Sequence, residues 1–318
     1  MNRPRILLTR RWPDAVEARL AKRYDVTRNQ TDEPLDATAL SRAMREYDAL
    51  CPTVTDRLPV AVIATLGART RIIGNYGAGF EHIDLDAARA ADIVVTNTPD
   101  VLTDATADIA ILLMLMVTRR AGEAERELRA GQWTGWRPTH MLGQSLVGKT
   151  LGLVGYGRIA RAVAARASAF GMTIAYHCRT PAPDMPRNAY YPTLAALAER
   201  ADILSLHAPG GNETRHMIDT ALLARMPRHA VLINTGRGSL VDEDALATAL
   251  KSGTIAAAGL DVFESEPHVP ASLIALPNVV LLPHLGSATH ETRTAMGMKV
   301  ADNIDRFFDG KQPHDRIA

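Results

Sequence analysis

Cysteine is scarce in this sequence, and its placement limits the chemistry that the chain can carry. The 318 residues include only Cys51 and Cys178, which lie far apart and in no CxxC pattern. Neither a disulfide framework nor a cysteine-bound metal is therefore expected. We predict two free thiols in a reducing compartment, and no metal site.

The sequence also lacks net charge and long apolar runs. A formal net charge of +1 gives no overall field that would attract nucleic acid or a membrane surface. The longest apolar run, 109–117, is flanked by Asp108 and Arg119 and is too short to span a bilayer. The apolar stretch near the N-terminus is too short for a signal peptide. We expect a cytoplasmic protein in which residues 109–117 form a buried helix at a domain or subunit contact.

The sequence does contain two successive alternations of strand-like and helix-like segments. Such alternation predicts α/β domains with parallel sheets, here Rossmann-like or flavodoxin-like. The first covers residues 1–99, and the amphipathic segment 287–318 is expected to return to it, which makes this substrate-binding domain discontinuous. The second covers residues 100–286. It begins with one helix predicted over 104–130 and continues with six strands, as in a doubly wound dinucleotide-binding domain.

A glycine-rich turn lies between the first strand and helix of the second alternation. Gly155, Gly157 and Ala160 form G-x-G-x-x-A, in which the first glycine permits a tight turn and the second lets a pyrophosphate approach the backbone. Amides at the start of the helix face the anion, and Arg158 adds a charge contact. A lone match of this kind is a weak signal, and a turn without a ligand remains the alternative.

The residues after the next predicted strand bear on the choice of cofactor. A dinucleotide-binding domain usually has an acidic residue there, which accepts hydrogen bonds from the ribose 2′-hydroxyl. This sequence has Arg179 and Thr180 instead, and a guanidinium offers a fork of donors to a phosphate dianion. We therefore predict a preference for NADP(H) over NAD(H). The alternative is a solvated surface arginine.

Three further strand ends carry polar residues of complementary chemistry. Arg237 follows the fourth strand, Glu264 and Glu266 follow the fifth, and His284 follows the sixth. Ligands of doubly wound sheets bind at the carboxyl ends of the strands. A histidine can protonate a forming alkoxide, a carboxylate can orient the imidazole, and an arginine can pair with a substrate carboxylate. This set predicts carbonyl reduction by hydride transfer, and spacing alone does not choose between the two glutamates.

Seven segments spread over essentially the whole chain resemble the D-isomer-specific 2-hydroxyacid dehydrogenase family. These segments are "NYGAGFEHID", "NTPDVLTDATAD", "GKTLGLVGYGRIA", "LHAPGGNETRHMI", "INTGRGSLVDEDAL", "GLDVFESEP" and "LLPHLGSAT". The resemblance implies that Arg237, Glu266 and His284 are catalytic, and it selects Glu266 over Glu264. Gly236 departs from the residues that are common before this arginine, a change that we do not expect to alter the chemistry.

The resemblance also implies where substrate and cofactor bind. Backbone amides around Ala78 and Gly79 are expected to bind the substrate carboxylate. Trp136 and Met141 are expected to close over the substrate from a neighbouring subunit, with simple loop packing as the alternative. The predicted cofactor-binding residues are Thr103, Gly155, Gly157, Arg158, Ile159, Arg179, Thr180, His207, Ala208, Pro209, Thr214, Thr235, Gly236, Asp261, Gly286 and Ser287.

Within the family, "NYGAGFEHID" and "WTGWRPTHMLG" resemble the glyoxylate/hydroxypyruvate reductase branch. This implies NADPH-dependent reduction of glyoxylate to glycolate and of hydroxypyruvate to D-glycerate, in an interdomain cleft and by a homodimer without nucleic-acid or membrane partners. One alternative is a D-2-hydroxyacid dehydrogenase for another acid, such as phenylpyruvate or a 3-phosphoglycerate-like acid. Others are a non-catalytic dinucleotide-sensing protein, and formate or phosphite oxidation on the same scaffold.

Overall fold

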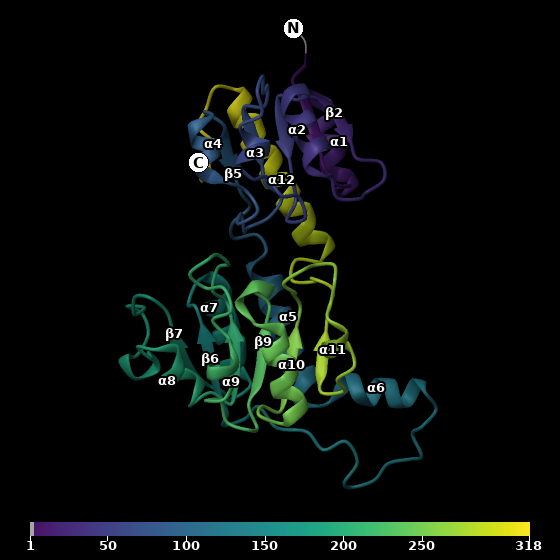
Figure 1. Cartoon of the computed structure of the whole chain (residues 1–318), viewed down its shortest axis with the longest axis vertical. Coiled ribbons are helices and arrows are strands. Elements are labelled where there is room, and N and C mark those ends of the chain that lie inside the picture. The colour runs from purple at the N-terminus through teal and green to yellow at the C-terminus, as the bar shows by residue number, and fades with distance from the viewer. Residues whose placement is uncertain (1–2) are drawn as a thin grey trace. The chain divides into compact units, whose positions relative to one another are not determined.

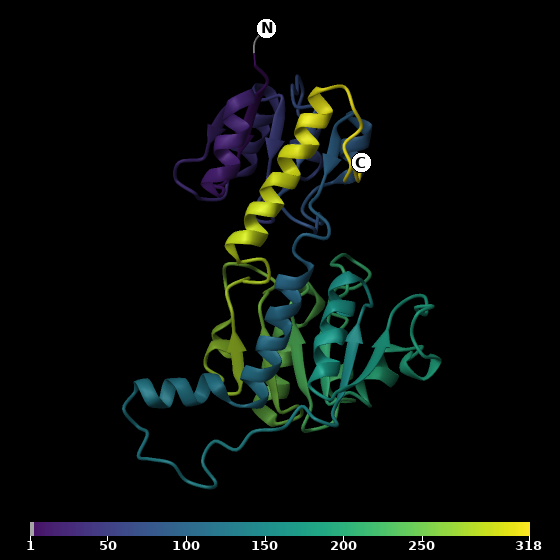
Figure 2. The same cartoon turned by 180° about the vertical axis from the view of Figure 1, so that it is seen from behind.

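The computed structural model describes residues 3–318, which divide into two compact units, each built on one parallel sheet (Figures 1 and 2). Unit 1 combines the chain up to Leu102 with Ala288–Ala318, and unit 2 is Thr103–Ser287. Within the described residues, no helix has the length and apolar character needed to cross a membrane.

The sheet of unit 1 has the strand order β2-β1-β3-β4-β5, which is the flavodoxin-like order. Its strands are β1 (Arg5–Leu8), β2 (Asp25–Arg28), β3 (Ala49–Cys51), β4 (Ile72–Gly74) and β5 (Val94–Thr96). Strand β2 cannot be predicted from apolar patterns, because it is an edge strand whose four residues are all exposed or half-buried. The other strands are largely buried and carry the apolar runs from which a parallel sheet is predicted.

Helices cover both faces of this sheet. The helices of unit 1 are α1 (Asp14–Arg23), α2 (Ala37–Glu46), α3 (Val60–Ile63), α4 (Leu85–Ala90) and α12 (His290–Phe308). Helices α1 and α12 share one apolar cluster with the sheet, and α2, α3 and α4 share the other. Helix α12 approaches β4 closely, because a Cβ on Gly74 would lie 2.7 Å from the Val300 side chain. The C-terminal helix is thus part of the core of unit 1.

The sheet of unit 2 has the order β11-β10-β9-β8-β6-β7, so all six predicted strands are present and parallel. They are β6 (Thr150–Val154), β7 (Thr173–His177), β8 (Ile203–Leu206), β9 (Val231–Asn234), β10 (Ala257–Leu260) and β11 (Val279–Leu281). A single-residue bridge from Tyr176 to Tyr190 extends the edge beyond β7. Tyr190 thereby takes the place of the third strand in the dinucleotide-binding order. The order reverses between β6 and β8, where ligands of such sheets bind.

Unit 2 also has helices on both faces. They are α5 (Thr103–Thr118), α6 (Ala121–Arg129), α7 (Arg158–Ala169), α8 (Leu194–Ala198), α9 (Thr220–Leu223), α10 (Glu243–Ser252) and α11 (Ala271–Ile274), with short 3-10 turns at Arg187–Ala189 and Gly238–Leu240. Helices α5 and α7 pack on one face (Figure 2), and α8 to α11 pack on the other. The apolar run 109–117 lies in α5, which is buried along much of its length.

The prediction of a single helix over 104–130 is wrong, because the helix is interrupted between α5 and α6. Arg120 adopts a left-handed backbone conformation with φ of 53°, which ends the helix. The carbonyl of Thr118 accepts a hydrogen bond from the Gln144 amide at 2.8 Å instead of continuing the helix. Such a contact between distant segments leaves no trace in local sequence periodicity. Helix α6 buries none of its residues.

Candidate active site

His284 and Glu266 form a directly bonded pair beyond the carboxyl ends of β10 and β11. The Nδ1 atom of His284 lies 2.8 Å from Oε2 of Glu266, and both side chains keep about a third of their surface exposed, at 36% and 31%. The other oxygen of Glu266 accepts a hydrogen bond from the Phe263 amide at 3.0 Å. With Nδ1 engaged, the imidazole has Nε2 available for proton exchange.

The surroundings of Glu266 keep its carboxyl ionised. Burial by itself raises the pKa, but the hydrogen bond and the charge of His284 oppose this effect. The Phe263 amide and the Arg237 charge act in the same direction, so the pKa of Glu266 lies below its ordinary value. An ionised carboxylate is what is required to hold an imidazole in its protonated form.

The backbone at His284 is held in an unusual conformation by Asp261. His284 has a φ of 54°, which is uncommon for a residue other than glycine. Its amide donates to the Asp261 carbonyl at 2.9 Å. The buried Asp261 carboxylate accepts from the amides of Leu285 at 2.6 Å and Gly286 at 2.8 Å, while Thr106 donates to the Gly286 carbonyl at 3.1 Å. Burial raises the pKa of Asp261, and the two amides offset only part of this rise.

Arg237 is brought to the same edge by a tight crossing of two loops. A Cβ on the following residue, Gly238, would lie 1.9 Å from the carbonyl carbon of Phe263, so only glycine fits there. Buried Asn234 shapes the turn, since its side-chain amide donates to the Arg237 carbonyl at 2.9 Å and its oxygen accepts from the Gly236 amide at 3.0 Å. The structure therefore brings the loops that bear Arg237 and Glu266 into contact.

The two glutamates of this loop have different partners. Glu264 accepts from Nε2 of His216 at 3.0 Å and forms an ion pair with Arg215 at 2.5 Å. Its amide donates to the side chain of Glu243 at 2.9 Å. Glu266 alone of the pair contacts His284. The position of His216 at no strand end gave no reason to single it out, and its contact depends on the folding of two loops.

The glycine-rich turn fits the phosphates of a dinucleotide. Gly155 has a φ of 85°, and a Cβ there would lie 2.8 Å from the His207 carbonyl oxygen, so a glycine is required. Around Gly157 a Cβ would meet nothing within 4 Å, which leaves the backbone open to a ligand. No side chain caps the start of α7, and no acidic residue lies in its first turn. Its first amides can therefore bind a phosphate.

Thr235 and His207, on the same sheet edge, have properties that favour cofactor binding over proton transfer. The Thr235 hydroxyl oxygen is buried and has no hydrogen-bond partner within residues 3–318, which is the state expected of a group awaiting a ligand. Burial lowers the pKa of His207 to about 4, so its imidazole is neutral at physiological pH. Nε2 of His207 lies 2.9 Å from the hydroxyl of Ser205.

Arg179 and Thr180 are both exposed just beyond β7. Within the described part of the chain, Arg179 forms no ion pair with a carboxylate. Arg161 of α7 is paired with Asp184 and lies over the ring of Tyr156, at 4.7 Å from its centroid. Arg179 therefore leaves a positive charge just beyond β7, where a dinucleotide-binding domain places the adenosine ribose.

The remaining predicted cofactor residues lie in unit 2, at strand ends or helix starts. Thr103 begins α5, Ile159 is in the first turn of α7, Ala208 and Pro209 follow β8, and Gly286 and Ser287 follow β11. The Thr214 hydroxyl is used within its own loop, where it donates to the Pro209 carbonyl at 2.8 Å. At Gly236, a Cβ would lie 3.2 Å from the Leu206 carbonyl oxygen, which explains the small residue.

The predicted substrate residues lie in two different places. Ala78 and Gly79 follow β4, at the carboxyl edge of the sheet of unit 1. Trp136 and Met141 belong to the extended segment between α6 and β6. This segment runs on the opposite side of unit 2 from the carboxyl ends of its strands (Figures 1 and 2). The side chain of Trp136 is 81% exposed. The segment that carries them therefore lies away from the sheet edge that His284 follows.

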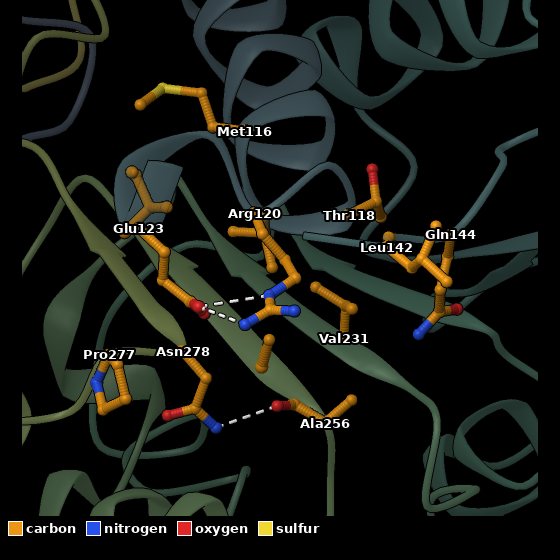
Figure 3. A pocket seen from close by; sticks show the side chains of 15 residues that line it. Met116, Thr118, Arg120, Glu123, Leu142, Gln144, Val231, Ala256, Pro277 and Asn278 are labelled. Atoms are coloured by element: carbon orange, nitrogen blue, oxygen red, sulfur yellow. Dashed lines mark hydrogen bonds and ion pairs between the residues drawn. The ribbon is translucent and has the colours of Figure 1, made fainter. Parts of the chain in front are cut away.

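The pocket drawn in Figure 3 also lies at the amino ends of the strands, so it is not part of this site. Its lining includes Val231, Ala257 and Asn278, which stand at or near the starts of β9, β10 and β11, together with Leu142 and Arg120.

Both cysteines are free thiols. Within residues 3–318, no cluster of three or more His, Cys, Asp or Glu side chains is arranged to hold a metal ion.

Known proteins are similar to this chain over nearly all of its length. Residues 111–286 match the family described as D-isomer specific 2-hydroxyacid dehydrogenase, NAD binding domain. Glyoxylate reductase of Thermococcus litoralis is 44% identical over 317 residues, which cover 98% of this chain and 96% of that protein. Glycerate dehydrogenase of Hyphomicrobium methylovorum is 38% identical over 314 residues, covering 98% of each. The NADPH-dependent glyoxylate/hydroxypyruvate reductase of Sinorhizobium meliloti, solved with NADP and malonate, superposes with a TM-score of 0.90 at 42% identity, covering 100% of this chain and 97% of that one.

Proposed function

Because this chain belongs to the D-isomer-specific 2-hydroxyacid dehydrogenase family, we propose that it reduces small 2-oxo acids with NADPH, glyoxylate to glycolate and hydroxypyruvate to D-glycerate. The chain is an oxidoreductase of the glyoxylate/hydroxypyruvate reductase branch. The observation that carries the proposed carbonyl reduction is the bonded pair His284–Glu266, which lies on the same sheet edge as the glycine-rich turn.

His284 acts as the proton donor in this mechanism. Its Nδ1–H stays bonded to Glu266, so Nε2 gives its proton to the carbonyl oxygen as that oxygen gains charge. When bound, the reduced nicotinamide supplies the hydride that the carbonyl carbon receives. Glu266 stabilises the imidazolium before transfer and keeps the ring in orientation afterwards.

Arg237 and the segment after β4 hold the substrate. The guanidinium would pair with the substrate carboxylate and polarise the carbonyl. Its charge also helps to lower the pKa of Glu266. The amides of Ala78 and Gly79 receive the same carboxylate.

Cofactor binding is assigned to the turn and the strand ends of unit 2. The amides at the start of α7, next to Gly157, would hold the pyrophosphate, and the unpartnered Thr235 hydroxyl would contact the nicotinamide side. Asp261 would lie on that side as well. Arg179 and Thr180 would receive the 2′-phosphate, which is the basis for a preference for NADPH.

We propose that the partner of the chain is a second copy of itself. Helix α6 buries none of its residues, and apolar side chains on it and on the segment that follows are exposed: Leu128 at 60%, Trp133 at 51% and Leu142 at 65%. Light scattering should give twice the chain mass, and Leu128→Glu should shift the protein toward monomer. In the dimer, Trp136 and Met141 would reach the substrate of the partner. The cytoplasmic location stays a prediction.

A panel of 2-oxo acids tests the proposed activity. Purified protein is mixed with NADPH and, in separate reactions, glyoxylate, hydroxypyruvate, phenylpyruvate and 3-phosphohydroxypyruvate, and the loss of absorbance at 340 nm is recorded. The proposal expects the highest kcat/KM for the two smallest acids. A higher kcat/KM for phenylpyruvate or for the phosphorylated acid contradicts the substrate assignment. No consumption of NADPH or NADH with any acid contradicts the proposed activity.

A further inference from the structure

The segment after β4 has three consecutive carbonyl groups held by side-chain amides. Nδ2 of Asn75 donates to the carbonyl oxygens of Gly77 at 3.0 Å and Gly79 at 2.8 Å. Nδ2 of Asn97, just after β5, donates to the carbonyl oxygen of Ala78 at 2.8 Å. Both asparagines are buried, at 0% and 8% exposure. Two buried side chains therefore hold this segment, and the Gly77 carbonyl also accepts a hydrogen bond from the Thr98 amide at 3.0 Å.

Fixing these carbonyls also fixes the direction of the amides. In a trans peptide, the C=O of one residue and the N–H of the next lie in one plane and point in opposite directions. The Ala78 N–H therefore points away from the side on which Asn75 holds the Gly77 carbonyl. The Gly79 N–H likewise points away from the bond between Asn97 and the Ala78 carbonyl. Neither amide donates to an acceptor anywhere in the described chain, so both can bind the two oxygens of a carboxylate.

The side chain of Asn75 can adopt only one orientation of its amide. Its Oδ1 lies 3.0 Å from Nε2 of His82, while its Nδ2 faces two carbonyl oxygens. The reverse orientation would place Oδ1 against acceptors, so His82 must carry a proton on Nε2 and donate it. His82 is itself anchored, because its carbonyl accepts from the Leu58 amide at 2.8 Å.

We propose that Asn75, oriented by His82, and Asn97 are positioning residues that aim the amides of Ala78 and Gly79 at the substrate carboxylate. This inference rests on the proposed function, in which those amides bind the carboxylate. None of the three side chains is assigned a contact with the substrate. Their effect is on the binding of the acid and not on proton transfer at His284.

The test uses three variants of the full-length protein and one matched control. Asn75→Ala removes both bonds to the carbonyls, and His82→Leu removes the donor that orients Asn75. His82→Gln keeps an N–H donor at a similar reach. The control is Asn29→Ala, because Asn29 also donates to two backbone carbonyls of unit 1, those of Thr9 at 2.8 Å and Glu33 at 2.6 Å, but in another loop.

The readouts are KM and kcat for glyoxylate, the affinity for oxalate measured by calorimetry in the presence of NADP⁺, and the affinity for NADPH. Asn75→Ala and His82→Leu should raise KM and the oxalate Kd about tenfold or more, which is the scale for a misplaced hydrogen bond to a charged group. NADPH affinity should change less than about twofold, and kcat less than KM. His82→Gln should restore most of the oxalate affinity, and Asn29→Ala should match the wild type.

Unchanged oxalate affinity in folded His82→Leu overturns the proposal, and so does an equal loss in Asn29→Ala or in His82→Gln. If circular dichroism shows that Asn75→Ala does not fold, the two His82 variants decide the question. Oxalate binding does not depend on turnover. A wild-type protein that binds oxalate but reduces no 2-oxo acid would therefore contradict the proposed function and leave this inference standing on its own measurement.

Discussion

Nδ1 of His284 lies 2.8 Å from Oε2 of Glu266, although the two residues belong to loops that follow different strands. The contact exists because Asp261 holds the backbone of His284 in a left-handed conformation, while the Phe263 amide holds the other oxygen of Glu266. A histidine placed in this way has its ring fixed and one nitrogen available. This geometry supports the proposed role of His284 in proton transfer.

Replacing His284 by alanine should abolish most of the turnover and leave cofactor binding intact. The imidazole is the assigned proton donor, and general acid catalysis contributes on the order of 10²–10⁴-fold. We expect kcat for glyoxylate to fall by about that factor, measured as NADPH absorbance loss. The NADPH Kd, measured by fluorescence, should change less than about threefold. His314→Ala, an exposed histidine of unit 1, serves as the control. Near-normal kcat in His284→Ala would contradict the mechanism.

The lowered pKa of Glu266 gives a prediction for stability against pH. A carboxyl whose pKa is lower in the folded protein than in the unfolded chain stabilises the fold at pH above its unfolded value. That contribution is lost as the pH falls through the folded value. The difference in unfolding free energy between wild type and Glu266→Gln should therefore shrink as the pH falls below the ordinary value of 4.5. Urea unfolding at pH 5, 4 and 3 measures this difference, and a difference that grows over this range would be inconsistent with a lowered pKa of Glu266.

Arg179 should determine the preference for NADPH over NADH. Arg179→Ala removes the donors assigned to the 2′-phosphate and should lower kcat/KM for NADPH about tenfold to a hundredfold, with little change for NADH. Arg200→Ala, an exposed arginine elsewhere in unit 2, should change neither value. Initial rates at several concentrations of each cofactor provide the comparison. Equal losses with both cofactors would assign Arg179 to another role.

Two glycines of unit 2 should respond in opposite ways to the same substitution. Gly238→Ala places a Cβ 1.9 Å from the Phe263 carbonyl carbon, so it should lower the melting temperature and separate the Arg237 and Glu266 loops. Gly157→Ala meets nothing within 4 Å, so it should fold like the wild type but raise the KM for NADPH. Thermal unfolding and cofactor titration distinguish the two. A normal KM for NADPH in Gly157→Ala would argue against the pyrophosphate assignment.

Much of the fold could be predicted because buried parallel strands have continuous apolar runs, as in "LGLV" of β6 and "VLIN" of β9. The elements at the edges of the two sheets could not be predicted in this way. Strand β2 is half-exposed and polar, and the edge position beyond β7 is occupied by a bridge at Tyr190 alone. The break at Arg120 depends on the contact between Gln144 and Thr118, which no local pattern encodes.

In the candidate site, too, some residues could be predicted from the sequence and others could not. The strand-end rule brings Arg237 and His284 to one edge because carboxyl ends of parallel strands share an edge. Asn75, His82 and His216 could not be predicted in this way. Their contacts are with backbone carbonyls or with side chains of other loops, and those loops acquire their shape only in the folded chain. The sequence placed all three inside the segments that resemble the family, but it gave no contact partner for any of them.

We propose that the reaction at this site adds a hydride to one face of the carbonyl carbon of a small 2-oxo acid and a proton to its oxygen. The most direct measurement incubates the purified protein with hydroxypyruvate and NADPH, and determines the NADPH consumed and the glycerate formed, the latter by chiral chromatography. We expect one molecule of D-glycerate to be formed for each molecule of NADPH oxidised. No oxidation of NADPH, or the formation of L-glycerate, would contradict it.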